Sequence, residues 1–169
     1  MIFVALGANV PFRDLSPVDT MRAALGQFPA YGLNPVTVSR VYASPAWPDP
    51  ADPPFVNAVA AVATGLSAED SLAALHRIED LFGRRRLHAN APRTLDLDLL
   101  DHGGAIRRGP GLVLPHPRLS ERAFVLLPLQ DVAAGWQHPE TGASLAALIA
   151  ALPAGWVCTP VGTLVPPRG

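Results

Sequence analysis

The chain has 169 residues, of which 49% are hydrophobic and 16% charged, and its formal net charge is −1 at pH 7. These values predict one folded domain with a substantial core; they exclude a disordered chain and give no general attraction to nucleic acid or membranes. All 13 basic residues are arginines, so a lysine-containing phosphate loop and a Schiff-base lysine are excluded.

The chain opens with a short apolar segment. Residues 2–6 are all apolar but are too few for a membrane span and lack a basic leader, so we predict a strand and a cytoplasmic protein. Ser16 and Pro17 form a helix-capping sequence, and apolar residues then recur at helical spacing, which predicts a helix at about 17–28.

Residues 36–42 alternate in polarity and predict a second strand. The ten residues from Pro45 to Pro54 contain five prolines, which is typical of a semi-rigid lid. An Ala- and Val-rich strand is predicted at 55–63.

A second helix is predicted from Ser67, a capping residue, to about Phe82. Glu79 borders the apolar stripe of this helix. It could orient arginines or bind a substrate donor, or it could be an ordinary exposed helix acid.

The segment 92–100 places two carboxylates, Asp96 and Asp98, inside an apolar run. Side chains alternate along a strand, so both acids point to the face opposite to the leucines, where they repel each other unless a cation lies between them. Two carboxylates completed by water and phosphate oxygens form a typical Mg²⁺ site. The alternative is an edge strand with a solvated acidic face.

A polar loop with four arginines, Arg84, Arg85, Arg86 and Arg93, precedes and enters the acidic strand. Paired guanidinium donors match phosphate oxygens, which indicates a polyphosphate held between arginines and a carboxylate-bound metal. A solvated basic loop would explain the arginines alone.

The remainder of the chain gives weaker patterns. Glycine-rich turns are expected at 103–111, an extended piece at 112–116, a helix at 121–134 broken by Pro128, and a short helix at 145–152. We expect one domain spanning residues 1–169, in which the tail from about 153 to 169 has no assignable structure. Cys158 is the only cysteine, which excludes a disulfide within the chain.

The element order β-α-β-β-α-β predicts an α+β fold, a ferredoxin-like antiparallel sheet with helices on one face and extra C-terminal helices. Several segments of this order resemble the 6-hydroxymethyl-7,8-dihydropterin pyrophosphokinases, also called 2-amino-4-hydroxy-6-hydroxymethyldihydropteridine diphosphokinases. The resemblance covers about residues 2–130. It rests above all on Pro-Arg-Thr-Leu-Asp-Leu-Asp, and also on Val-Ala-Leu-Gly-Ala-Asn, Tyr-Ala-Ser-Pro, Phe-Val-Asn-Ala, Ile-Glu, Pro-His-Pro and Arg-Ala-Phe.

The resemblance implies transfer of diphosphate from ATP to 6-hydroxymethyl-7,8-dihydropterin in folate biosynthesis, with release of AMP. It implies that two Mg²⁺ ions are held by Asp96 and Asp98, and that Arg84, Arg93 and these two acids form the catalytic set. Pterin contacts are implied for Ser44, Pro45, Trp47, Phe55, Asn57 and Phe124, with the ring between the two phenylalanines. ATP contacts are implied for Glu79, Arg84, Arg93, Leu99, His116 and Arg122.

The chain departs from the family pattern where Asn90 and Ala91 replace an aromatic, and at Gly111 and Pro117. Contacts to the ribose and triphosphate, and closure over the site, are therefore open from the sequence. We expect a monomer without nucleic-acid or membrane partners. The alternatives are a metal-dependent nucleotide phosphohydrolase and a non-catalytic ligand-binding or RNA-recognition module.

Overall fold

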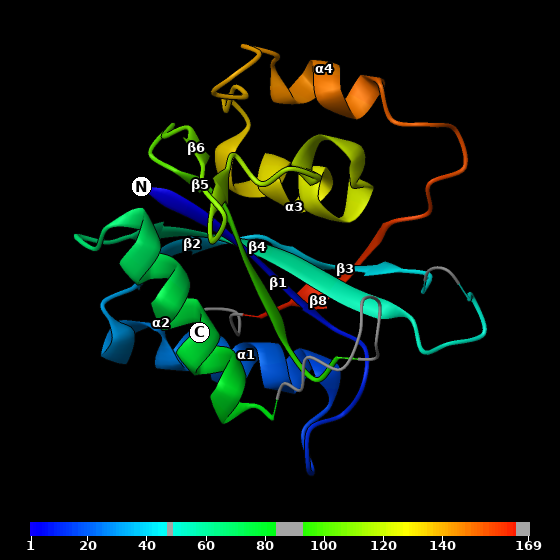
Figure 1. Cartoon of the computed structure of the whole chain (residues 1–169). Coiled ribbons are helices and arrows are strands. Elements are labelled where there is room, and N and C mark those ends of the chain that lie inside the picture. Colours follow the sequence, from blue (N-terminus) through cyan, green and yellow to red (C-terminus); the bar gives the residue numbers. More distant parts are fainter. Residues whose placement is uncertain (47–48, 84–92, 165–169) are drawn as a thin grey trace.

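The computed structural model describes residues 1–46, 49–83 and 93–164. Its main sheet has the strand order β5-β1-β4-β3-β8, and β2 also pairs with β4 (Figure 1). All described pairs of strands in this sheet are antiparallel. The strands are β1 (Ile2–Ala8), β2 (Asn34–Val38), β3 (Arg40–Ser44), β4 (Phe55–Ala63), β5 (Asp96–His102) and β8 (Thr159–Thr163).

Helices cover both faces of this sheet. Figure 1 shows α1 (Pro17–Gln27) and α2 (Ala68–Leu81) below the sheet, and α3 (Ala123–Ala133) and α4 (Leu145–Ala150) above it. The two helices of the predicted β-α-β-β-α-β unit thus share one face, and the additional C-terminal helices form a third layer. No helix in the described ranges is long and apolar enough to cross a membrane.

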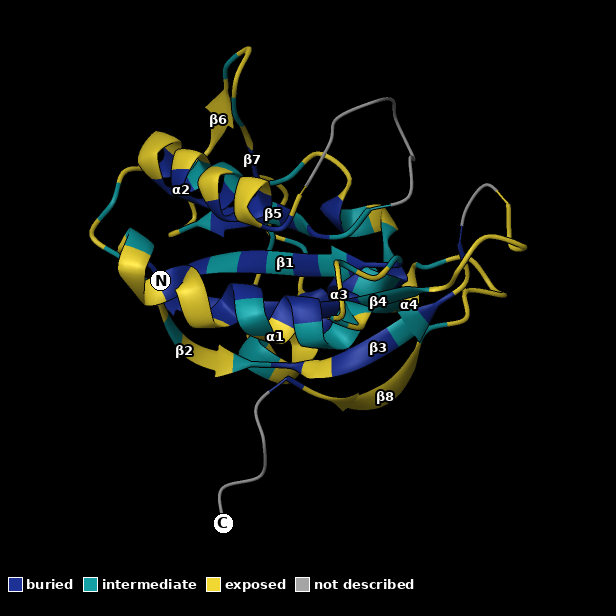
Figure 2. Cartoon of the chain, turned by 90° about the horizontal axis from the view of Figure 1, so that it is seen from below, coloured by how far each residue is buried: buried dark blue, intermediate teal, exposed yellow. Residues whose placement is uncertain are grey.

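The three layers enclose two apolar cores. One core lies between the sheet and α1 and α2, and it contains Phe28, Leu75 and Ile78. The other lies on the α3 side and includes Val59, Leu126 and Leu129. Figure 2 shows the central strands largely buried, whereas β8 is exposed along its length. Each face of the sheet therefore contributes to a separate apolar core.

Both capping residues act as predicted. Ser16 and Ser67 accept hydrogen bonds from the backbone N–H groups of Asp19 and Asp70, and the helices begin at the next residues. The strand expected at 55–63 is confirmed as β4, and the alternation around Asp96 and Asp98 is confirmed in β5.

The single strand predicted at 36–42 is wrong, because the chain forms β2 and β3 with a break at Ser39. The hydroxyl of Ser39 accepts the N–H of Val59, and the next N–H, that of Arg40, is donated to the Asp131 carboxylate. A side chain thus takes the place of a backbone acceptor, and the ladder is interrupted.

The predicted break at Pro128 is also wrong, since α3 continues through it. Proline removes one helical N–H, but Pro128 is buried with Leu126 and Leu129, and this packing holds the helix together. Two short strands, β6 (Arg107–Arg108) and β7 (Val113–Leu114), pair with each other where turns and an extended piece were expected. The tail left unassigned contains β8, which pairs with β3.

Candidate functional site

A cavity of about 790 Å³ lies on the α3 face of the sheet, at the end where β1, β3, β4 and β5 present their neighbouring termini. This volume suits a small ligand. Nine residues predicted for the site line the cavity: Ser44, Pro45, Phe55, Asn57, Arg93, Asp96, Asp98, Arg122 and Phe124. Segments far apart in the sequence therefore meet at one place.

Asp96 and Asp98 face this cavity because side chains alternate between the two faces of a strand. Leu97 is buried in the core beneath α2, so its neighbours Asp96 and Asp98 project from the opposite face of β5. β1 pairs Gly7 with Asp96 and Ala5 with Asp98, and these small partners leave open space beside both carboxylates. Two carboxylates can hold a divalent cation completed by ligand oxygens and water.

The described residues do not form a metal site from protein ligands alone, since no group of three His, Cys, Asp or Glu residues among them is placed to hold an ion. Asp96 forms an ion pair with Arg93 instead, and Asp98 lies 3.9 Å from both Arg122 Nη1 and His116 Nε2. The donor set fits Mg²⁺ that is bound mainly through the oxygens of a phosphate ligand, because such ions need only one or two carboxylates.

Arg93 is held at the cavity by Asn9. The Asn9 side-chain oxygen accepts the backbone N–H of Arg93 at 2.8 Å, and the Asn9 N–H is donated back to the Arg93 carbonyl at 3.1 Å. The Asn9 amide also donates to the carbonyl of Pro53 in the proline-rich loop. One buried side chain therefore connects the loop before β4 to the residue that precedes the acidic strand.

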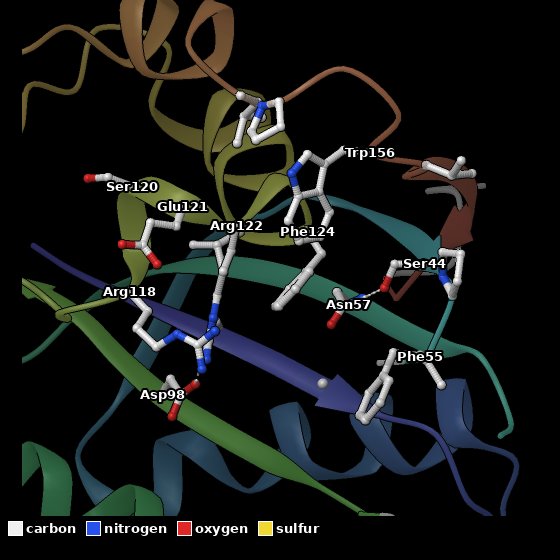
Figure 3. A pocket seen from close by; sticks show the side chains of 18 of the residues that line it. Ser44, Phe55, Asn57, Asp98, Arg118, Ser120, Glu121, Arg122, Phe124 and Trp156 are labelled. Atoms are coloured by element: carbon white, nitrogen blue, oxygen red, sulfur yellow. Dashed lines mark hydrogen bonds and ion pairs between the residues drawn. The ribbon is translucent and has the colours of Figure 1, made fainter. Parts of the chain in front are cut away.

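Two arginines face Asp98 from the segment before α3. Figure 3 shows the guanidinium groups of Arg118 and Arg122 close together near Asp98. Burial lowers the pKa of Arg122, and the like charge of Arg118 lowers it further. Two adjacent guanidinium groups repel each other and so favour a bound anion between them.

His116 is neutral beside these arginines. Burial lowers its pKa to about 4, and the charges of Arg122 and Arg118 act in the same direction against the opposing effect of Asp96. Its Nδ1 accepts the N–H of Arg118, so Nε2 carries the proton on the side of Asp98. His116 can therefore donate a hydrogen bond to an oxygen without adding a positive charge.

The other end of the cavity is aromatic and uncharged. Phe124 and Phe55 lie on α3 and β4, with open space between their rings (Figure 3). The Asn57 amide donates to Ser44 Oγ at 3.1 Å across paired strands, which fixes the orientation of Asn57 toward the cavity. We call Phe55, Phe124, Ser44 and Asn57 the aromatic end, and the arginines and aspartates described above the charged end.

A Cβ atom at Gly7 would lie 3.3 Å from Asn57 Oδ1. The absence of a side chain at Gly7 therefore leaves the cavity open beside Asn57.

Glu79, Leu99 and His116 are not among the residues that line the cavity. Glu79 is 1% exposed, which rules out the exposed-acid alternative, and its Oε1 accepts the N–H of Leu97 at 2.7 Å. It therefore supports β5 from beneath, between the two aspartates. Leu99 is buried in the same core. Of the other residues predicted for the site, Trp47 and Arg84 lie outside the described residues.

Arg118 and Trp156 line the cavity but were not predicted for it. Arg118 stands two residues after His116, and its position in the Pro-His-Pro-Arg sequence is the signal that could have indicated it. Trp156 lies in the tail that could not be assigned, where neither periodicity nor a motif marks it.

Comparison with known proteins matches residues 3–134 to a family model described as 7,8-dihydro-6-hydroxymethylpterin-pyrophosphokinase (HPPK). The chain is 43% identical over 156 residues to the 2-amino-4-hydroxy-6-hydroxymethyldihydropteridine pyrophosphokinase of Pseudomonas aeruginosa, covering 90% of this chain and 91% of that protein. It is 35% identical over 145 residues to a folic acid synthesis protein of Pneumocystis carinii, covering 86% of this chain but 19% of that protein.

Solved structures give the same picture of the fold. A wild-type HPPK-DHPS of Plasmodium falciparum superimposes with a TM-score of 0.63 at 14% identity, covering 88% of this chain and 43% of that one. An HPPK-DHPS in complex with substrates gives a TM-score of 0.65 at 11% identity, covering 88% and 42%. The chain thus spans less than half of these solved chains, and at such identities the likeness concerns the fold.

Proposed function

The chain belongs to the 7,8-dihydro-6-hydroxymethylpterin-pyrophosphokinase family, and on that premise we propose that it transfers a diphosphate group from ATP to 6-hydroxymethyl-7,8-dihydropterin. The products are the pterin diphosphate and AMP, and the reaction is a step of folate biosynthesis. The observation that carries the proposal is the meeting of an aromatic end and a charged end in one cavity. A flat heterocycle and a triphosphate demand these two environments.

The aromatic end is assigned to the pterin. Its ring lies between Phe55 and Phe124, because a flat heterocycle gains from apolar faces on both sides. Asn57 is held by Ser44 and bonds to the polar edge of the ring. Pro45 and Trp47 complete the site in this proposal, as the family resemblance implies.

The charged end is assigned to ATP and magnesium. Asp96 and Asp98 would hold two Mg²⁺ ions together with phosphate oxygens, and this metal would supply neutralisation of the triphosphate charge. Arg93, Arg118 and Arg122 contact phosphate oxygens, and neutral His116 donates from Nε2. Arg84 joins them from the loop before β5, and Leu99 contributes through its backbone.

Glu79 acts as a positioning residue in this proposal. Because it accepts the N–H of Leu97, it fixes the strand segment that carries both aspartates and need not contact the nucleotide. This differs from the direct ATP contact implied by the resemblance.

The reaction needs positioning and charge neutralisation rather than a covalent intermediate. The hydroxymethyl oxygen of the pterin attacks the β-phosphorus of ATP, the bond from that phosphorus to the α-phosphate oxygen breaks, and AMP leaves with that oxygen. The hydroxyl proton is released. The aromatic end holds the nucleophile, and the arginines of the charged end stabilise the charge on the transferring group.

The decisive assay combines ATP, magnesium and the hydroxymethyl-dihydropterin, with separation of the nucleotide products. AMP formed only when the pterin is present supports the proposal. ADP as product, or ATP turnover that does not depend on the pterin, would instead identify a nucleotide phosphohydrolase. Binding of both ligands without turnover would indicate a non-catalytic module.

The strand order of the sheet supports a ferredoxin-like arrangement of β1, β3, β4 and β5, with the C-terminal helices as an addition. We further propose a single domain over residues 1–169 that acts in the cytoplasm as a monomer.

A further inference from the structure

The segment from residue 151 to 158 crosses the cavity on the side of α3 and α4. It is attached at both ends, since Leu145 of α4 is buried in the core with α3, and Thr159 of β8 pairs with Ala43 of β3. Ala43 directly precedes Ser44 of the aromatic end. The connection between α4 and β8 is therefore held against the aromatic end by elements on either side of it.

Trp156 is the aromatic residue of this segment. It lines the same cavity as Phe55 and Phe124, and Figure 3 shows its indole beside Phe124, on the side away from Phe55. The residue is nevertheless 46% exposed. Tryptophan is usually largely buried in a folded protein, and this exposed indole surface lies at the cavity wall, where a bound ligand can cover it.

We propose that Trp156 is a third aromatic contact of the pterin, and that binding of the pterin buries its indole. This inference rests on the proposed function. Since the ring itself lies between Phe55 and Phe124 in the proposed function, the indole beyond Phe124 contacts the pterin at its edge, where it extends the apolar wall and shields the bound heterocycle from water. The segment that carries it lies outside residues 3–134, the part that matches the family model.

The surroundings of the indole distinguish it from a structural tryptophan. Trp136 is 9% exposed and donates its Nε1–H to the buried carboxylate of Asp101 at 2.9 Å. Trp156 has much more exposed surface and belongs to a connection between elements. Replacing Trp136 therefore removes a core contact, whereas replacing Trp156 changes the cavity wall.

The test measures dissociation constants of 6-hydroxymethyl-7,8-dihydropterin and of Mg·ATP separately by calorimetry. For Trp156→Ala we expect the pterin constant to rise about tenfold from lost apolar burial, with the ATP constant unchanged. Trp156→Phe should recover most of the pterin affinity. Val161→Ala, which removes another exposed apolar side chain on β8, should change neither constant.

A second readout is the access of acrylamide to tryptophan. Pterin binding should protect emission from quenching in the wild type more than in Trp156→Phe, and Trp47 and Trp136 contribute equally in both proteins. The inference is overturned if the wild type binds the pterin, Trp156→Ala binds it equally well, and pterin binding protects the wild type from quenching no more than it protects Trp156→Phe. The proposed function stands in that case. If the wild type does not bind the pterin, the proposed function fails and the inference fails with it.

Discussion

The two ends of the cavity are built in different ways. The aromatic end takes its residues from β3, β4 and α3, and the bond from Asn57 to Ser44 fixes two of its side chains. The charged end contains three arginines and two aspartates, and Asp98 lies 3.9 Å from both Arg122 Nη1 and His116 Nε2. The aromatic end is therefore uncharged, whereas the charged end brings like-charged arginines together beside two carboxylates, an arrangement that a phosphate and a metal ion would stabilise further.

The largest effect is expected at the aspartates. Asp96→Ala or Asp98→Ala should lower kcat/KM by on the order of 1,000-fold, because each removes a carboxylate that holds charge-neutralising Mg²⁺. Thermal melting without magnesium should change little, and Glu69→Ala, which removes an exposed carboxylate elsewhere, should leave activity intact. A large loss of stability in the metal-free aspartate variants would mean that the pair is structural and that the charged end is as preformed as the aromatic end.

Arginine substitutions should have the next largest effect. Arg93→Ala should reduce both ATP affinity and turnover, by about 100-fold in kcat/KM, because Asn9 holds this residue at the cavity before the nucleotide arrives. Lys at this position should rescue only in part, since a point charge lacks the paired donors of guanidinium. Arg107→Ala is the matched control on the exposed β6 strand. Measuring kcat and, separately, the ATP dissociation constant checks the result. Unchanged ATP binding would contradict a contact between Arg93 and the nucleotide in the ground state.

The aromatic end should respond to one ligand only. Phe55→Ala and Phe124→Ala should each weaken pterin binding by about 1–3 kcal/mol, through lost stacking and apolar burial, while ATP affinity is retained. Calorimetric titration of each ligand measures both effects. Equal losses for the two ligands would show that the ends are not independent and that the cavity has collapsed.

The smallest effect concerns a contact away from both ends. Asp131 of α3 accepts hydrogen bonds from Arg40 and Tyr42 of β3. Partial burial would raise the pKa of Asp131, but the bonds from Arg40 and Tyr42 outweigh it and leave the pKa below the ordinary 3.8. The contact therefore stabilises the fold above that value and is lost as the pH falls through the lower folded pKa. Asp131→Asn should lower the melting temperature slightly at pH 7 and remove this acid dependence. An unchanged acid dependence would exclude the contact as its source.

Residue patterns alone indicated most of the charged end but not the aromatic end, and for a physical reason. Asp96, Asp98 and Arg93 stand in one short segment whose alternation is visible without a structure. Phe55 and Phe124 are ordinary apolar residues until β4 and α3 bring them together, so they required the family resemblance. Trp156 had neither signal.

The misassigned elements have a similar explanation. The β8 sequence, Thr-Pro-Val-Gly-Thr, contains two residues that disfavour strands, and it is extended because it pairs with β3 at the sheet edge. The break at Ser39 depends on Val59, a partner distant in sequence, and the continuity of the helix at Pro128 depends on burial of this residue in the fold. Local propensity could not report either partner.

The pairing of β5 with β1 contains a bulge whose consequence reaches beyond the cavity. Phe3 pairs with Asp101 and Val4 with Leu99, so Leu100 is an extra residue in β5. It shifts the alternation of the strand, so that Leu100 and the next residue, Asp101, both contact the side of the sheet that carries Trp136. Loss of one residue here would keep the composition of the strand but change which face each later side chain occupies, including Asp101, the acceptor for Trp136. This strand should therefore not tolerate insertions or deletions during evolution, even where its composition is retained.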